Sequence, residues 1–283
     1  MNHIRSYPDY YVKIFVQQSL SKREKYCLDL LRKGLSDHFE VKENYFNHII
    51  LPAGRKGFVI RKALRWLIPY EELKEFRNAY IGDVDFLIVR EDPPLMEGHL
   101  IHCGKIGVPY SNRIRSGTKR LTGLHFIRVQ KYYRKMDPII RLFLRNPEKL
   151  YRMLNRYQSN EEFLYRIVEC GIGFGKITEV PYRPLHGFHL GWLRGSRDST
   201  GYFAPDSSNR QRVEYDNLKK GLNEYFHDPL FRRMLSILPN PEIIKLSRLV
   251  SMADTLELNF SSKGGKAGYI SGFGDKQHPG DTP

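Results

Sequence analysis

The stretch Gly82-Asp83-Val84-Asp85-Phe86-Leu87-Ile88-Val89 joins two acidic residues to an uninterrupted apolar run. An apolar run of this length, entered at a turn, predicts a buried central strand over residues 84–90. A second apolar segment, residues 99–108, contains Cys103-Gly104-Lys105 and predicts a neighbouring strand. Pro93-Pro94 suits neither a helix nor a strand ladder, so we expect a hairpin with a loop between the two strands.

Helices and further strands are predicted on both sides of this pair. Ser21-Lys22-Arg23-Glu24 is a capping-box sequence, and the apolar residues after it have helical spacing. Helical spacing also predicts a helix over 124–136, which Asp137-Pro138 should end. The full set of expected elements is a helix over 21–38, β-rich pieces over 40–51 and 57–68, the helix over 124–136, helical segments to about residue 167, a strand over 172–180, and helices over 209–226, 228–237 and 240–256.

This order of elements is typical of an α+β fold, in which helices flank a mixed central β-sheet and a helical C-terminal region follows. We expect an N-terminal extension (1–20), a core with a helical insertion (21–182), the helical region (183–258) and a disordered tail (259–283). The tail is predicted because its Gly, Lys, Ser and Pro residues leave few apolar groups to form a core.

Positive charge is concentrated between Lys105 and Tyr157. Fourteen Lys and Arg residues stand there against two acidic residues, so the segment supplies +12 of the net charge of +15. Clustered positive charge favours nucleic acid, because each neutralised phosphate releases a condensed counterion; a solvated basic face without a partner is the alternative. The polar, turn-forming stretch Ser111–Arg120 is a candidate phosphate-contacting loop. The predicted nucleic-acid contacts are Arg113, Arg115, Lys119, Arg120, Arg128 and Lys131.

The acidic strand entry, the lysine of the second segment and the helix that follows resemble the PD-(D/E)xK nuclease superfamily, over roughly residues 20–180. The resemblance implies that Asp85, helped by Asp83, holds a metal ion and that Lys105 positions or activates the attacking water. It places Gln130 on the helix after the two strands, as a further catalytic residue. The chain departs from the family pattern at Cys103, where the family has a carboxylate.

Phosphodiester cleavage at such a site needs hard oxygen ligands, so Mg²⁺ is the expected ion. The predicted metal ligands are Asp85, Asp83 and Glu97, and Glu97, Asp83 or Glu24 would have to supply the missing carboxylate. In the alternative interpretation, the two Asp residues accept hydrogen bonds within a turn and Lys105 is an ordinary surface side chain.

A zinc site is not expected, although its donor types are present in His99, His102, Cys103, His186 and His189. On a strand, the side chains of His99 and His102 would point to opposite faces. His186 and His189 fall in a segment rich in Pro and Gly, where we expect ordinary, partly exposed histidines.

The cysteine content and the hydropathy of the chain indicate the compartment in which the protein is expected. Cys27, Cys103 and Cys170 are odd in number and far apart, which argues against disulfides and for a reducing compartment. No run is long and apolar enough to span a bilayer, and Met1–Pro8 has no apolar signal-peptide core. A cytoplasmic protein without a membrane partner is expected.

The leading interpretation is a nucleic-acid-binding, metal-dependent phosphodiesterase, with DNA favoured over RNA as its partner, or a degenerate derivative of one. The rival is a non-catalytic basic protein that binds nucleic acid or takes part in an assembly, and Cys103 supports it. A homodimer or a protein partner is compatible with both.

Overall fold

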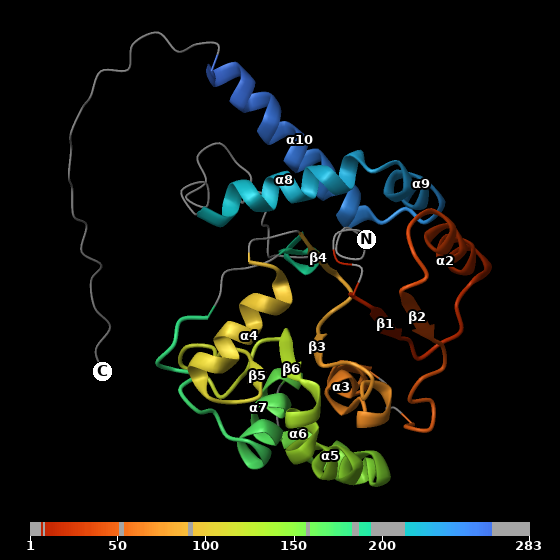
Figure 1. The fold of residues 1–283 in the computed structure, drawn as a ribbon. Coiled ribbons are helices and arrows are strands. Elements are labelled where there is room, and N and C mark those ends of the chain that lie inside the picture. The colour runs from red at the N-terminus through yellow and green to blue at the C-terminus, as the bar shows by residue number, and fades with distance from the viewer. Residues whose placement is uncertain are drawn as a thin grey trace, which may run out of the picture.

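The structure is a computed structural model that describes residues 7, 9–50, 54–89, 93–156, 159–182, 187–193 and 213–261. The expected α+β class with a helical C-terminal region is confirmed. Helices α8, α9 and α10 lie at one end of the molecule and α5, α6 and α7 at the other, with the strands between them (Figure 1). The α-helices are α2 (Lys22–Gly34), α3 (Gly54–Leu64), α4 (Leu95–Ile106), α5 (Val129–Arg145), α6 (Pro147–Arg156), α7 (Asn160–Gly171), α8 (Val213–His227), α9 (Pro229–Ile237) and α10 (Pro241–Ser261).

The described strands form three small sheets where one mixed sheet was expected. The first pairs β1 and β2 in parallel, the second has the antiparallel order β3-β6-β5, and the third pairs β4 and β7 antiparallel. Three short 3₁₀ helices, η1 (Arg65–Leu67), η2 (Tyr70–Glu72) and η3 (Leu190–Leu193), complete the elements. The strands are β1 (Val12–Phe15), β2 (Phe39–Lys42), β3 (Asn78–Ile81), β4 (Phe86–Ile88), β5 (Tyr110–Ser111), β6 (His125–Arg128) and β7 (Gly187–His189).

Helix α2 begins at the predicted capping box. The backbone N–H of Ser21 donates to Oε2 of Glu24 at 2.7 Å, and the N–H of Glu24 donates to the Ser21 hydroxyl at 3.3 Å. These bonds satisfy two donors that a helix N-terminus otherwise leaves free. The helices predicted over 228–237 and 240–256 are present as α9 and α10, and α8 covers the described part of the helix predicted over 209–226, of which residues 209–212 lie outside the described residues.

The strand predicted over 99–108 is wrong, because this segment is helix α4. Its buried side chains, Leu95, His99, His102, Cys103 and Ile106, recur at helical spacing and pack toward β5 and β6. The helix starts after Pro94 and ends at Gly107, whose φ of 75° is the left-handed conformation of a helix C-cap. The helical period of apolar residues is hard to recognise in this sequence, because two of the residues on the buried face are the polar His99 and His102.

Replacing Gly104 with Ala should stabilise the protein by about 0.5–1 kcal/mol, because a glycine inside a helix costs that much conformational entropy. Gly104 is exposed in α4, and a Cβ there would meet no atom within 4 Å. The free energy of unfolding from urea titration is the measurement. Gly107→Ala is the control and should destabilise, because a residue with a Cβ adopts its φ of 75° only at a cost in energy. A destabilising Gly104→Ala would contradict the helical assignment of α4.

The helix predicted over 124–136 is wrong at both ends. Residues 125–128 form β6, and α5 continues through Pro138 to Arg145. A proline inside a helix costs about 3 kcal/mol. The buried face of α5 offsets this cost with Val129, Tyr132, Tyr133, Met136, Ile140 and Phe143.

Other β predictions are wrong as well. Within residues 57–68 the chain forms most of α3 and then η1, and among the described residues 40–50 only the end of β2 is a strand. Residues 172–180 form turns, in which Gly173 and Gly175 have positive φ. A Cβ at Gly175 would lie 2.2 Å from the Ile106 carbonyl oxygen, so the backbone approaches α4 closely there.

The buried apolar residues form two clusters. The larger extends from Phe46 to Ile177, and the smaller contains Val89 together with residues between Phe188 and Val250. β1 lies in the expected N-terminal extension and pairs with β2. The expected tail begins within α10, and residues 262–283 lie outside the described part of the chain. None of the described helices has the length and apolar character that crossing a membrane requires.

Candidate metal and nucleic-acid site

Three side chains that can bind a metal ion meet where β4 begins. A carboxylate oxygen of Asp83, one of Asp85 and a ring nitrogen of His189 all lie within 4.8 Å of one another. Nε2 of His189 is 3.3 Å from Oδ1 of Asp85. Two carboxylates suit Mg²⁺ or Mn²⁺, and the imidazole shifts the preference toward Mn²⁺. Three protein ligands would leave coordination positions open for other oxygen atoms.

The pairing of β4 with β7 brings these ligands together from distant parts of the sequence. Phe86, which follows Asp85, is the register partner of His189, and the N–H of Leu190 donates to the Asp85 carbonyl at 2.9 Å. The pairing requires a glycine at position 187, because a Cβ there would lie 2.2 Å from the Leu87 carbonyl oxygen. The site therefore depends on an unusually close backbone approach.

Arg65, from η1, contacts Asp83, one of the three possible ligands. Its guanidinium forms an ion pair with Asp83, and Nη2 donates to Oδ1 of Asn160 at 3.0 Å. The guanidinium also lies 4.3 Å from the centre of the Trp66 ring. Arg65 therefore balances part of the negative charge of the group and competes with a metal ion for Asp83.

The other predicted catalytic and metal residues lie on different elements. Lys105 is exposed in the last turn of α4, and Figure 1 shows β4 near the other end of that helix. Glu97 is exposed in the first turn of α4 and is not part of the three-ligand group. Gln130 is exposed at the start of α5. The expected strand carrying Lys105 beside Asp85 is replaced by a helix.

Cys103 does not offer a metal ligand. Its side chain is 3% exposed on the buried face of α4, and burial raises the pKa of the thiol to about 12. The thiol therefore stays protonated at neutral pH, whereas a metal ligand has to be a thiolate. A carboxylate introduced at Cys103 would be buried in the core rather than placed in the site.

The expectation for His99 and His102 is corrected by the helical form of α4. Both side chains lie on one buried face, and Nδ1 of each is within 2.9 Å of the Ser111 hydroxyl. A hydroxyl between two imidazoles donates to one ring and accepts from the other. His186 lies outside the described residues, and His189 joins Asp83 and Asp85 instead of a zinc set.

The candidate phosphate-contacting loop is an ordered hairpin over residues 113–121. Ile114 and Leu121 form an antiparallel bridge, and the N–H of Arg115 donates to the Arg120 carbonyl at 2.9 Å. Gly117 has a φ of 66°, which the tight turn requires. Arg113, Arg115 and Lys119 are exposed, and Arg120 is partly buried.

Asn112 holds the base of this hairpin. Its side-chain oxygen accepts hydrogen bonds from the N–H of Arg113 at 2.7 Å and from the N–H and hydroxyl of Thr122 at 2.9 and 2.7 Å. Its Nδ2 donates to the Thr122 carbonyl and to Nδ1 of His125. The hairpin is thus presented on a fixed base, which limits the conformational entropy that binding a partner would cost.

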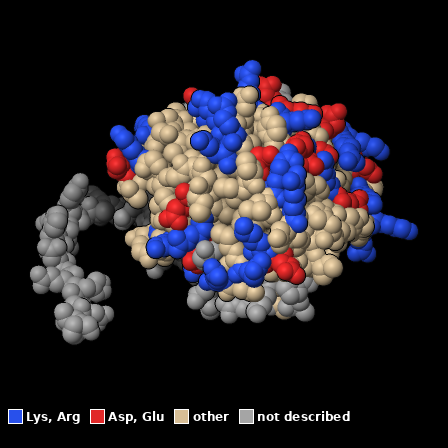
Figure 2. Space-filling model, turned by 90° about the horizontal axis from the view of Figure 1, so that it is seen from below, with Lys and Arg blue, Asp and Glu red and all other residues tan. Residues whose placement is uncertain are grey.

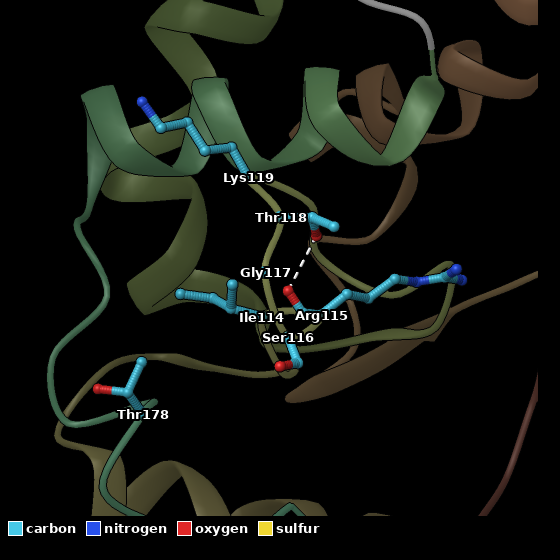
Figure 3. Close-up of a pocket in the computed structure, with 7 residues that line it drawn as sticks. All are labelled: Ile114, Arg115, Ser116, Gly117, Thr118, Lys119 and Thr178. Carbon is cyan, nitrogen blue, oxygen red and sulfur yellow. Dashed lines mark hydrogen bonds between the residues drawn. The ribbon is translucent and has the colours of Figure 1, made fainter. Parts of the chain in front are cut away.

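A hollow of about 470 Å³ lies between the hairpin and Thr178 (Figure 3). Ser116, Thr118 and Thr178 belong to its lining, and the Thr118 hydroxyl donates to the Arg115 carbonyl at 2.9 Å. The side chains of Arg115 and Lys119 extend in different directions (Figure 3). The hairpin therefore offers its cations along a surface and not inside a closed phosphate pocket.

The basic residues do not form one continuous patch on the face seen in Figure 2. Lys and Arg lie there in several separate groups, with Asp and Glu among them. Arg128 is partly buried at the end of β6 and Lys131 is exposed on α5, so these two predicted contacts are not part of the hairpin. Their place in a nucleic-acid interface stays a prediction.

Three residues of this site were not predicted in their observed roles. The sequence indicates His189 only as a zinc donor type, and it gives no indication of Arg65 or Glu161. Nη2 of Arg115 is 2.7 Å from Oε1 of Glu161, which lies in the first turn of α7. No local signal identifies these residues, because each reaches the site through tertiary packing.

Comparison of the chain with models of protein families, with curated proteins and with solved structures finds no match. The chemistry of the site is therefore the basis for a function, because a fold alone does not define one.

Proposed function

We propose that this protein binds nucleic acid, with DNA preferred to RNA, and hydrolyses its phosphodiester backbone with a divalent ion held by Asp83, Asp85 and His189. The convergence of these three ligands carries the proposal, together with the position of Asp83 beside Gly123, next to the Glu161 that pairs with Arg115 of the hairpin. Mg²⁺ or Mn²⁺ bound there would polarise a phosphate oxygen and lower the pKa of a bound water. The exposed cations of the hairpin would hold the backbone in place.

The first motif of the PD-(D/E)xK resemblance agrees with the structure, whereas the second motif does not. Asp85 directly precedes β4, as the first motif of that family requires. The segment with Cys103 and Lys105 is helical, so we assign no catalytic role to Lys105 or Gln130 and no metal-binding role to Glu97.

A non-catalytic nucleic-acid-binding protein is the second candidate, and the ion pair between Arg65 and Asp83 favours it. In that case Arg65 takes the place of the metal ion as the partner of Asp83. The basic hairpin would then bind the backbone without any hydrolysis.

Asp85→Asn should lower the rate of DNA cleavage by at least about 100-fold, because the substitution keeps the shape of a metal ligand but removes its charge. The assay follows cleavage of single- and double-stranded DNA and RNA with Mn²⁺ or Mg²⁺, and EDTA should abolish it. Asp29→Asn, which changes an exposed carboxylate on α2, is the matched control and should cleave normally.

The two candidate functions predict different results. Binding without cleavage of any substrate by the wild type would favour the non-catalytic protein. Metal-dependent cleavage that Asp85→Asn leaves unchanged would contradict the proposed site.

A further inference from the structure

Four charged side chains from four parts of the chain meet around Gly123. A Cβ at Gly123 would lie 3.2 Å from Nη2 of Arg65, 3.3 Å from Oδ2 of Asp83 and 3.5 Å from Oε1 of Glu161. Arg115 of the hairpin joins the group through its 2.7 Å ion pair with Glu161. We call Arg65, Asp83, Arg115 and Glu161 the Gly123 cluster. Its two cations and two anions balance, so the cluster carries no net charge.

Both arginines retain capacity to bind another anion. The Nε–H of Arg65 is buried and, within the described part of the chain, makes no hydrogen bond. The side chain of Arg115 is 50% exposed beside the hairpin turn. Guanidinium groups bind phosphate through paired, charge-assisted hydrogen bonds, which are about twice as strong as neutral ones. A phosphate could therefore compete with Asp83 for the guanidinium of Arg65, whose side chain is 15% exposed, and with Glu161 for the guanidinium of Arg115.

Asp83 links the Gly123 cluster to the three-ligand group, because it belongs to both. When Arg65 pairs with Asp83, the guanidinium lowers the attraction of Asp83 for a metal ion. When a phosphate takes Arg65, Asp83 is released. The same exchange runs in reverse, since a metal ion at Asp83 releases Arg65 for a phosphate.

We propose that Arg65 and Arg115 are phosphate-binding residues held by Asp83 and Glu161 in the free protein, so that nucleic-acid backbone and metal ion bind cooperatively. This inference rests on the proposed function of the three-ligand group. Beyond that function, it assigns Arg65 and Arg115 to a site for the phosphates of the backbone. It also means that the metal ion binds tightly only when nucleic acid is bound. Linkage makes the effect reciprocal, and couplings of this kind amount to about 5–150-fold in affinity.

The experiment measures Mn²⁺ affinity of the full chain with and without a short DNA duplex whose phosphorothioate linkages resist hydrolysis. Pulsed EPR detects Mn²⁺ that is coordinated by an imidazole nitrogen, and the same measurement on the duplex alone gives the contribution of ions held by guanine N7. The duplex should tighten Mn²⁺ binding by about tenfold or more in the wild type.

Two variants separate the roles of the arginines. Arg115→Gln changes an exposed side chain, so it should fold normally and weaken binding of the duplex, because one phosphate-binding arginine is gone. Arg65→Gln should lose most of the coupling and bind Mn²⁺ more tightly than the wild type without DNA, because the cation that competes for Asp83 is gone. A purely structural Arg65 would give weaker binding instead. Arg134→Gln, an exposed arginine on α5, is the control and should keep the full coupling.

Each outcome either supports or overturns the inference. Equal Mn²⁺ affinity with and without the duplex would overturn the coupling but leave the three-ligand group intact. Loss of coupling in Arg134→Gln to the same extent as in Arg65→Gln would also overturn it. Absence of any imidazole-coordinated Mn²⁺ would remove the proposed metal site and this inference together.

Discussion

Raising the salt concentration from about 50 to 200 mM should weaken DNA binding by about three to five orders of magnitude, if about six to ten phosphates are contacted. The effect is large because each neutralised phosphate releases a counterion, and added salt opposes that release. Fluorescence anisotropy with a labelled duplex at several salt concentrations gives the slope of log affinity against log salt. A slope near zero would contradict binding through the backbone.

The hairpin should account for a defined part of that slope. Replacing Arg113, Arg115, Lys119 and Arg120 with Ala should reduce its magnitude by about 0.9 for each phosphate that the variant no longer neutralises. The matched control replaces four basic residues of α2, Lys22, Arg23, Arg32 and Lys33, and so changes the net charge equally. If both quadruple variants lower the slope to the same extent, the hairpin has no special role.

Acidification from pH 6.5 to about 3 should destabilise the protein by roughly 4 kcal/mol through His125 alone. His125 is fully buried on β6, and burial lowers its pKa from 6.5 to about 3. The unfolded chain takes up a proton below pH 6.5, whereas the folded protein does not until about pH 3. The contribution of His125 to the free energy of unfolding is therefore fully present above pH 6.5 and is lost progressively as the pH falls toward 3.

The structure around His125 explains why the ring stays neutral. Its Nδ1 accepts a hydrogen bond from Nδ2 of Asn112 at 3.0 Å, so a proton on Nδ1 would face another donor. The rings of Trp66, Tyr110 and Tyr132 surround it. No described group offers it a negative charge through an ion pair.

His125→Phe isolates this contribution. The free energy of unfolding, measured in urea between pH 7.5 and 4, should depend less steeply on pH in the variant than in the wild type. His99 and His102 are buried too, but they are present in both proteins, so the difference between the two profiles reports His125. Parallel pH profiles would show that His125 does not titrate in this way.

Elements with strong local signals could be predicted from the sequence. Ser21 and Glu24 supply both partners of a capping box within four residues, and α2 begins there. Asp228 accepts from the N–H of Phe231 and Pro229 occupies the first turn, so α9 also has a local start signal. The acidic entry to β4 was equally visible, because Asp85 directly precedes the apolar run.

The remaining elements depend on contacts that the local sequence does not show. α4 buries His99 and His102 against Ser111, and polar residues on a buried face hide the helical period. Pro138 predicts a helix end, yet the packing of α5 outweighs its cost. His189 reaches Asp85 because β7 pairs with β4 about one hundred residues earlier in the chain. His189, Arg65 and Glu161 therefore could not be assigned to the candidate site from the sequence.

Pulsed EPR of bound Mn²⁺ can decide whether Asp83, Asp85 and His189 hold a metal ion, on which the proposed function depends. We expect one Mn²⁺ per chain with coupling to an imidazole ¹⁴N nucleus. His189→Ala should remove the ¹⁴N coupling, while His227→Ala, which changes an exposed histidine at the end of α8, should keep it. Mn²⁺ binding with an unchanged ¹⁴N signal in His189→Ala, or no Mn²⁺ binding by the wild type with DNA present, would contradict the proposed metal site.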